Sequence, residues 1–500
     1  MKLVFNNPVV KGFYPDPSVC KAGDTYYLVC STMHYFPGVP IFESKDLINW
    51  TQIGHCLTRK SQIMLDKVYS SGGVFAPSIR YNNGRFYMTT TNSTTQQNFY
   101  VWTDDIHGEW SEPIYIDQDG IDPSFYFEDG KAYFMSNGSD DNGIGGVVQC
   151  EIDIEMGKKL APSHCIWQGS GGRYLEGPHL YKINSKYYLV AAEGGTEYGH
   201  MVTYARGDSP YGPFEAYPHN PVLTNRNLGG YELQAVGHGD LVQDNSGNWW
   251  ILHLGFRQIG QWLTFHHLGR ETFLTPITFG EDGWFTAGHN GTTLKAFDTE
   301  RLSDTIVQVE KKFYTFGNTQ WDKDWCYLRL PHEENYEFED NQLTLKGTDI
   351  SLDKADSPTF IGIRQKDFNA LISCEVCITE GEAGISLYMD ENHHYDLAIR
   401  KHESGYEAIE RLNIGDIKSV QKAVDLKNTD NISLIIHAKN EYYSFFIERE
   451  GKEILLGTAQ TRYLSSEVAG GFTGVIIGLY AYGESGCNHA KFTDFKCEYL

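Results

Sequence analysis

Hydrophobic and polar residues alternate in short runs along most of this chain, and over the first 255 residues the runs form a repeat. A Pro-Ser-like dipeptide is followed, about nine residues later, by an aromatic pair inside an apolar run. Turn residues such as Asn82-Asn83-Gly84 lie between the two, so each copy predicts a strand, a tight turn and a second strand. The five copies begin at Asp16-Pro17-Ser18, Ala76-Pro77-Ser78, Asp122-Pro123-Ser124, Gly177-Pro178-His179 and Gly239-Asp240-Leu241.

The copies begin about 46 to 62 residues apart, which is typical of the blades of a β-propeller. Beyond the repeats, residues 287–303 are rich in Gly, Thr and Asp and are expected to form a linker. Later segments, among them 342–345 and 433–437, alternate apolar and polar residues in the manner of an antiparallel sandwich. Since 500 residues exceed what one core usually organises, we predict an all-β protein with a five-bladed propeller at 1–295 and a β-sandwich at 304–500.

Composition narrows the class of protein further. Aromatic residues make up 14% of the chain, which argues against disorder, and the net charge of −24 argues against nucleic acid or an anionic membrane as partner. We expect no transmembrane helix and no secretory signal, because neither an apolar run of sufficient length nor an N-terminal apolar region is present. The ten cysteines are scattered, and the close pair Cys374 and Cys377 falls in an alternating stretch that favours a strand over a redox or zinc motif. Free thiols in a reducing cytoplasm are the expectation.

Three of the five copies carry a carboxylate beside the same structural position, namely Asp16, Asp122 and Glu176. Equivalent positions on the innermost strands of a propeller surround one axis, so these side chains should converge. Hydrolysis of a glycosidic bond needs one protonated carboxyl group and one ionised carboxylate, and crowding in a dehydrated pocket can keep one of them protonated near neutral pH. Each acid alone could be turn chemistry, because Asp before Pro is a common turn starter. Burial of three carboxylates at equivalent positions of the repeat would cost folding free energy unless each had a partner or a function. We therefore predict a catalytic site.

Several motifs of the chain, in this order, resemble glycoside hydrolase family 43. The chain is most similar to the branch of β-xylosidases and α-L-arabinofuranosidases that carries a C-terminal β-sandwich. The resemblance covers the whole predicted propeller and, more weakly, the C-terminal domain. The motifs lie at residues 7–18, 72–77, 120–124, 174–180, 191–196, 237–239 and 268–272.

The resemblance implies a five-bladed propeller, a concanavalin-A-like sandwich and an inverting mechanism. Asp16 would be the general base, Glu176 the general acid, and Asp122 the residue that orients the acid and raises its pKa. Inversion requires the base and acid carboxyls to lie roughly 6.5 to 9.5 Å apart, with room for a water.

Five further residues are candidates for substrate binding. Arg270 could donate hydrogen bonds to sugar hydroxyls or form an ion pair with the acids. Phe75 could form an aromatic wall against the apolar face of a pentose. His238, taken to share the repeat phase of Glu176, is used beneath the sugar in family members, in some through a hydrated calcium ion; a core histidine is the alternative. Met33 and His34 lie in segment 31–38, where positions 33 and 35 are typically Phe and Trp in the xylosidase branch, so the sugar preference stays open. The chemistry needs no cofactor, and one His is a poor calcium site, so a structural Ca²⁺ is optional.

We expect an exo-acting enzyme that releases D-xylose from the non-reducing end of short β-1,4-xylooligosaccharides. The alternatives are an α-L-arabinofuranosidase or an enzyme with both activities, and, from another class, a non-catalytic propeller lectin. The presence of all three acids disfavours the lectin. The expected partner is a small oligosaccharide, with no nucleic acid and no membrane. Self-association into a homo-oligomer and the role of the sandwich stay open.

Overall fold

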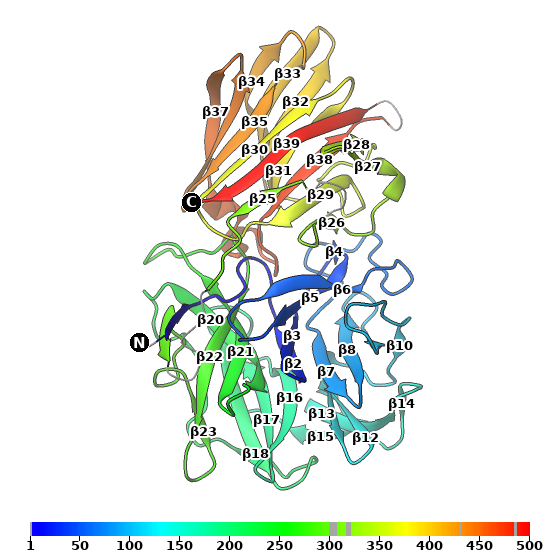
Figure 1. Ribbon diagram of the computed structural model, residues 1–500, viewed down its shortest axis with the longest axis vertical. Coiled ribbons are helices and arrows are strands. Elements are labelled where there is room, and N and C mark those ends of the chain that lie inside the picture. Colours follow the sequence, from blue (N-terminus) through cyan, green and yellow to red (C-terminus); the bar gives the residue numbers. More distant parts are fainter. Residues whose placement is uncertain (1–2, 300–307, 317–321, 430–431, 485–487) are drawn as a thin grey trace.

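The computed structural model describes residues 3–299, 308–316, 322–429, 432–484 and 488–500. Two β domains lie one above the other along the long axis of the molecule (Figure 1). In the described residues the lower domain contains five sheets arranged as blades, each built around four antiparallel strands. The five-bladed propeller predicted from the repeat is therefore confirmed.

Each predicted strand-turn-strand unit forms the two inner strands of one blade, with the aromatic pair on the second strand. Cross-strand pairs such as Ala22 with Thr25 and Glu128 with Lys131 close the predicted turns. The strands of the five blades are β2 (Ser18–Ala22), β3 (Thr25–Val29), β5 (Gly38–Ser44) and β6 (Thr51–Leu57); β7 (Ser78–Asn82), β8 (Arg85–Asn92), β9 (Gln97–Thr103) and β10 (Ile114–Tyr115); β11 (Ile121–Glu128), β12 (Lys131–Ser139), β13 (Gly145–Asp153), β14 (Lys158–Lys159) and β15 (His164–Trp167); β16 (Glu176–Ile183), β17 (Lys186–Glu193), β18 (Met201–Gly207) and β19 (Glu215–Ala216); and β20 (Leu233–Gln243), β21 (Trp249–Arg257), β22 (Glu271–Phe279) and β23 (Phe285–Ala287).

The N-terminal segment closes the ring between the first and last blades. Strand β1 (Leu3–Asn6) pairs with β24 (Ala296–Thr299), and the backbones of Val10 and Thr272 bond to each other in both directions. The side chain of Asn7 donates to the carbonyl of Leu274 at 2.9 Å. These contacts join residues from 262 to 296 positions apart, so closure of the ring depends on long-range pairing.

The upper domain is a sandwich of two antiparallel sheets around the largest apolar cluster of the described residues. This confirms the predicted C-terminal β-sandwich. One sheet contains β25 (Phe313–Thr315), β27 (Tyr336–Glu339), β28 (Gln342–Lys346), β30 (Ala370–Cys377), β35 (Ser433–Ala438), β36 (Tyr442–Arg449), β37 (Lys452–Gln460) and β39 (His489–Tyr499). The other contains β4 (Tyr35–Phe36), β26 (Cys326–Leu328), β29 (Thr359–Arg364), β31 (Glu382–Asp390), β32 (His393–His402), β33 (Gly405–Ile414), β34 (Ile417–Leu426) and β38 (Ile476–Tyr482). The described helical segments are η1 (Glu333–Asn335), η2 (Thr461–Leu464) and α1 (Ser466–Ala469).

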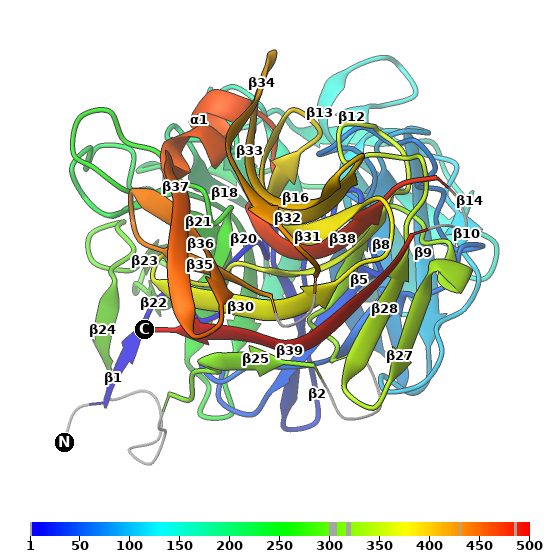
Figure 2. The ribbon, with the colours of Figure 1, turned by 90° about the horizontal axis from the view of Figure 1, so that it is seen from above.

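The sandwich sits over one end of the propeller (Figure 2). Strand β4 lies in the propeller part of the sequence yet pairs with β26 of the sandwich. Phe13 and Met33 of the propeller pack with Phe360 and Tyr388 of the sandwich in one apolar cluster. The two domains are thus joined by a shared sheet and a shared core, which fixes the sandwich relative to the propeller axis.

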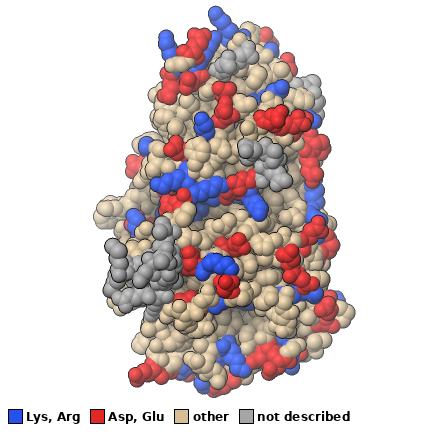
Figure 3. All heavy atoms as spheres, in the orientation of Figure 1, with Lys and Arg blue, Asp and Glu red and all other residues tan. Residues whose placement is uncertain are grey.

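The predicted boundary region lies partly outside the described residues, since 300–307 are not described, and the division into 1–295 and 304–500 stays a prediction. Within the described part of the chain the nine cysteines are free thiols; Cys487 lies outside it. Cys374 and Cys377 both lie on β30, as the strand interpretation predicts. None of the described helices has the length and apolar character needed to span a membrane. On the face shown in Figure 3, acidic and basic side chains are interspersed.

Candidate active site

Four of the five inner strands place a residue with left-handed backbone at the same position. These residues are Asp16 (φ 54°), Asp122 (φ 53°), Gly177 (φ 56°) and His238 (φ 47°). Each comes two residues before an inner-strand residue that pairs in register with the second strand, as Ser18 pairs with Val29 and Asp240 with Leu252. The left-handed residue breaks the strand alternation, and L residues adopt it at a cost of about 1–2 kcal/mol, which is often a sign of function.

This register corrects the predicted phase of His238. His238 occupies the position of Asp16 and Asp122, whereas in the fourth blade that position belongs to Gly177 and Glu176 lies one residue earlier. The prediction was one residue off because the fifth blade has a longer turn between its first two strands, joining Gln243 to Trp249.

The three predicted acids line one hollow of 80 Å³ on the propeller axis, together with Phe75, His238, Arg270 and Met33. Asp16 is buried and fully bonded: Arg270 Nη1 donates to its Oδ1 at 2.7 Å, and Ser31 Oγ donates to its Oδ2 at 2.5 Å. Burial by itself would raise the pKa of Asp16, but Arg270, His238 and the Ser31 bond outweigh it and hold the pKa below its ordinary value. Asp16 is therefore ionised at neutral pH.

The pKa values of Glu176 and Asp122 are raised, whereas that of Asp16 is lowered. Burial, reinforced by the charge of Asp16, raises the pKa of Glu176 to about 7, against a partial lowering by Arg270. Burial also raises the pKa of Asp122 well above its usual range, and the charges of Glu176 and Asp16 add to the effect. The amide of Gly177 donates to Asp122 Oδ2 at 3.1 Å, which links Asp122 directly to the strand that carries Glu176. At neutral pH the hollow thus holds an ionised and a protonated carboxyl group together.

A buried polar group lies two residues beyond the left-handed positions, where Ser18, His179 and Asp240 meet around Arg80. Arg80 Nη1 donates to Asp240 Oδ2 at 2.8 Å, and its Nη2 lies 2.8 Å from His179 Nδ1. Ser18 Oγ donates to the same Asp240 oxygen at 2.6 Å. Residues of four blades meet in this group, which therefore joins the inner strands across the propeller axis.

The segment before Glu176 is held by a further carboxylate, Glu193, which lies outside the repeat of carboxylates. Glu193, fully buried on β17, accepts bonds from the Ser170 amide (2.7 Å), the Gly172 amide and Thr203 Oγ1 (2.8 Å). The Gly194 amide also donates to the Arg173 carbonyl at 2.7 Å. These bonds set the path of residues 170–175 and so the position at which Glu176 enters its strand.

The remaining predicted contact residues fall into two groups. Phe75, Met33 and Arg270 line the hollow with the acids, and Arg270 also donates to Thr196 Oγ1 at 2.9 Å. His34 does not line it: this residue is fully buried, its Nδ1 lies 3.2 Å from the Ser71 amide, and burial, with the nearby Arg329, lowers its pKa well below the usual value. We therefore do not retain His34 as a sugar contact.

His238 lines the hollow, packed closely against Gly177, where a Cβ would lie 2.9 Å from its ring. Its Nδ1 is 4.0 Å from Asp122 Oδ2. In the described residues no group of three or more His, Cys, Asp or Glu side chains could hold a metal ion. An imidazole and one carboxylate do not fit Ca²⁺, which takes about six to eight oxygen ligands, so we derive no step through calcium.

The sandwich also contributes to the hollow, through Phe472. Its ring lies edge-on to Phe75 at 6.5 Å, its amide donates to Ser71 Oγ at 2.8 Å, and its carbonyl accepts from Arg270 Nη2 at 3.4 Å. The only local signal for this residue is the turn at Gly470 and Gly471, both with positive φ. Sequence reasoning missed Phe472 because more than 200 residues separate it from the rest of the site.

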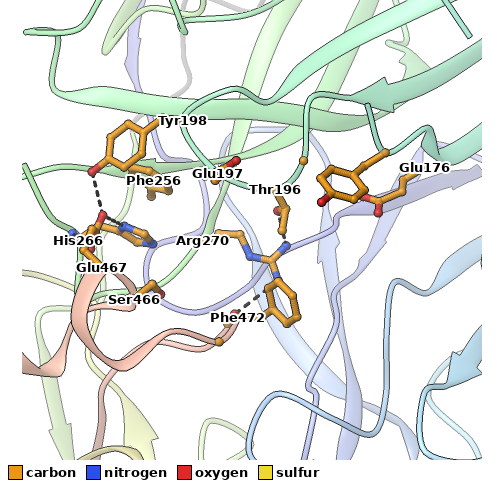
Figure 4. Close-up of a pocket in the computed structure, with 13 residues that line it drawn as sticks. Glu176, Thr196, Glu197, Tyr198, Phe256, His266, Arg270, Ser466, Glu467 and Phe472 are labelled. Atoms are coloured by element: carbon orange, nitrogen blue, oxygen red, sulfur yellow. Dashed lines mark hydrogen bonds and ion pairs between the residues drawn. The ribbon is translucent and has the colours of Figure 1, made fainter. Parts of the chain in front are cut away.

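A second, outer cleft of 540 Å³ adjoins the hollow, lined by propeller residues and by the segment around α1. Glu176 lies on one side of it and the group of His266, Glu467 and Tyr198 on the other, with Arg270 between them (Figure 4). Glu467 of α1 accepts from the Tyr198 hydroxyl at 2.7 Å, and its Oε1 lies 2.8 Å from His266 Nδ1. The cleft therefore runs along the seam between the domains.

Comparisons with known proteins agree with this architecture. Residues 5–285 match glycosyl hydrolases family 43, and residues 314–498 match the beta xylosidase C-terminal concanavalin A-like domain. The non-reducing end alpha-L-arabinofuranosidase BoGH43B of Bacteroides ovatus is 39% identical over 99% of this chain and 95% of its own length. A xylosidase/arabinosidase of Butyrivibrio fibrisolvens is 37% identical over 99% of this chain and 98% of its own.

The solved structure of the Bacteroides ovatus xyloglucan PUL GH43B has a TM-score of 0.93 at 38% identity, with both chains covered completely. The predicted resemblance and the predicted enzyme class are thus confirmed. This chain is a member of glycoside hydrolase family 43, with a propeller that holds the carboxyl groups and a concanavalin A-like domain that lies across their pocket.

Proposed function

We propose that this glycosidase is an inverting, exo-acting enzyme that removes one pentose from the non-reducing end of short oligosaccharides. In this proposal Asp16 is the general base, Glu176 is the general acid and Asp122 orients and modulates the acid. One observation carries it: two carboxyl groups in one hollow have pKa values displaced in opposite directions, that of Asp16 downward and that of Glu176 to about 7.

The chemistry follows from these two protonation states. Asp16 accepts a proton from water as the water oxygen attacks the anomeric carbon. Glu176 gives its proton to the glycosidic oxygen as the bond between that oxygen and the anomeric carbon breaks. Arg270 holds Asp16 ionised and in place, and the bond from the Gly177 amide holds Asp122 beside the acid. No cofactor enters these steps.

One observation supports end-on attack. The Arg80–Asp240 pair and its partners from four blades cross the propeller axis beyond the acids, so we expect a chain to enter the hollow by its end. Inversion is proposed from the family and requires the carboxyls of Asp16 and Glu176 to lie roughly 6.5 to 9.5 Å apart.

For the sugar, we propose that both α-L-arabinofuranosides and β-D-xylosides are substrates, with the arabinofuranoside cleaved faster. Support for this order comes from the relative with 39% identity, which is named an arabinofuranosidase, and the one with 37%, which is named for both activities. Met33 and Phe75, which line the hollow, are the residues at which the two sugars would be distinguished.

Assays of the purified protein on nitrophenyl α-L-arabinofuranoside and nitrophenyl β-D-xyloside test the proposal. We expect release from both, and NMR of the first product should show the inverted anomer. The Glu176→Ala variant should lose about 10²–10⁴-fold in kcat/KM on natural disaccharides and far less on nitrophenyl glycosides, which need little help from an acid. Equal losses on both would remove Glu176 from the acid role, and retention of anomeric configuration would contradict inversion. No release from either glycoside would favour the lectin.

A further inference from the structure

Arg364 carries a buried positive charge that no described side chain or carbonyl group satisfies. The residue lies at the end of β29 and is 1% exposed, and none of its three guanidinium nitrogens has a hydrogen-bond partner among the described residues. The guanidinium carbon lies 4.6 Å from the centre of the Tyr14 ring. An aromatic face attracts a cation, but it does not accept the N–H bonds that point outward from the guanidinium edge. Those donors therefore need a further partner.

Arg364 lies where the two domains meet. Strand β29 belongs to the sandwich sheet that continues through β26 into β4, the strand contributed by the propeller part of the chain (Figure 1). Tyr14 and Tyr35, also from that part of the chain, are close enough to the guanidinium to interact with its charge. The charge is therefore enclosed by both domains.

Arg329 shows how the same boundary satisfies another buried guanidinium. This residue is fully buried as well, and it donates to the carbonyl of Val68 in the propeller. It also donates to the carbonyl of Asp356 at 2.9 Å and to the carboxylate of Glu391 in the sandwich. A buried charge without such partners strongly destabilises the folded state. Arg364 has the burial of Arg329 without its protein partners.

The carboxylate that acts on Arg364 is already engaged by other cations. Asp324 accepts from Lys366 at 2.8 Å and from Lys311 at 2.9 Å, and Lys311 also pairs with Asp322 at 2.5 Å. Together with Arg364, this group has three positive charges and two negative charges. One monovalent anion would balance it.

A second donor near Arg364 is also unsatisfied. The Tyr35 hydroxyl is fully buried, has no hydrogen-bond partner in the described part of the chain, and interacts electrostatically with the guanidinium. An anion can accept from the guanidinium and from the hydroxyl at once. A water could accept the same bonds, but it would leave the positive charge of Arg364 uncompensated.

We propose that Arg364 and Tyr35 bind a small monovalent inorganic anion, with chloride as the natural occupant, between the propeller and the sandwich. The anion neutralises Arg364 and so stabilises the joined domains. It also supports Tyr14, whose amide donates to the Arg270 carbonyl at 3.1 Å. This site is independent of the proposed glycosidase chemistry.

Halide replacement in crystals of the full-length protein tests the identity of the ligand. After growth without chloride and a soak in sodium bromide, an anomalous bromide peak should lie within hydrogen-bonding distance of the Arg364 guanidinium and the Tyr35 hydroxyl. An ordered water at that point without a bromide signal would overturn the proposal, and so would bromide found only at the protein surface.

Thermal unfolding at constant ionic strength tests the stabilisation. Replacement of about 100 mM sodium gluconate by sodium chloride should raise the melting temperature of the wild type by about 2–4 °C, because a ligand that binds only the folded state stabilises it. Arg364→Met should abolish this rise, and Tyr35→Phe should reduce it. Arg329→Met is the matched control, since Arg329 is equally buried but bonded to protein groups. It should lower the melting temperature and keep the rise.

The comparison of variants separates a bound anion from a general salt effect. An equal rise for the wild type and Arg364→Met would identify a salt effect and overturn the site, and no rise in the wild type would overturn its stabilising role. If a methionine variant does not fold, Tyr35→Phe and the bromide peak decide: a reduced rise with a peak at Arg364 supports the site, and an unchanged rise without the peak ends it.

Discussion

At the scale of single residues, equivalent backbone positions in different blades carry carboxyl groups with different protonation states. Asp16 and Asp122 share their left-handed conformation and their place in the blade. Arg270 and Ser31 bond to Asp16 and favour its charged form, whereas Asp122 accepts one amide bond and lies among like charges. The partners, more than the position, decide which acid is ionised.

The pH dependence of activity should report these protonation states. The reaction needs Glu176 protonated, so kcat/KM on a natural disaccharide should fall about tenfold per pH unit above a pKa near 7, as the acid loses its proton. The acidic limb should lie below the usual range of Asp, because the pKa of Asp16 is lowered. A pH–rate profile measured from pH 3 to 9 checks both limbs. With nitrophenyl glycosides the alkaline limb should weaken; an unchanged limb would assign it to another group.

At the scale of elements, the hairpins of the repeat could be predicted because turn residues and alternation act locally. The irregularities that make the site were harder to predict. The pairing of β16 with β17 shifts register between Glu176 and His179, and β20 shifts twice around His238. Such bulges redirect side chains, and their position depends on pairing with the neighbouring strand, which the local pattern of residues does not show.

Gly177 offers a test of this close fit. Its φ is 56°, and a Cβ would meet the His238 ring at 2.9 Å, so Gly177→Ala should displace His238 and lower kcat/KM by more than tenfold. Gly130→Ala is the matched control, since Gly130 has φ 76° in a hairpin turn with nothing within 4 Å of a Cβ. Both substitutions should cost about 1 kcal/mol of stability from the left-handed backbone. Measured by thermal unfolding and kinetics, equal activity of the two variants would contradict the steric argument.

At the scale of the whole molecule, the sandwich forms part of the wall of the pocket. The shared sheet through β4 and the bonds of Glu467 to the propeller hold the segment that ends at Phe472. Phe472 then lines both the inner hollow and the outer cleft. The site belongs to the assembled pair of domains.

Removal of the Phe472 ring should reveal this contribution. Phe472→Ala takes away one aromatic wall and opens the hollow to water, so kcat/KM should fall about tenfold or more with little change in melting temperature. Val468→Ala is a matched control, because both side chains are 42% exposed on the same segment and Val468 lines neither space. Kinetics that are the same for both variants would place Phe472 outside the working site.

The amino-acid sequence by itself determined the five repeats, the strand-rich sandwich, the three carboxylates and the family, because these follow from local alternation, turn chemistry and ordered motifs. It did not reveal the ion pair of Arg80 with Asp240, the burial of His34, the anchoring role of Glu193 or the part played by Phe472. Those depend on contacts between residues far apart in the chain. Tertiary structure alone decided which carboxyl keeps its proton, because burial and the charges around a group exist only once the blades and the sandwich have come together.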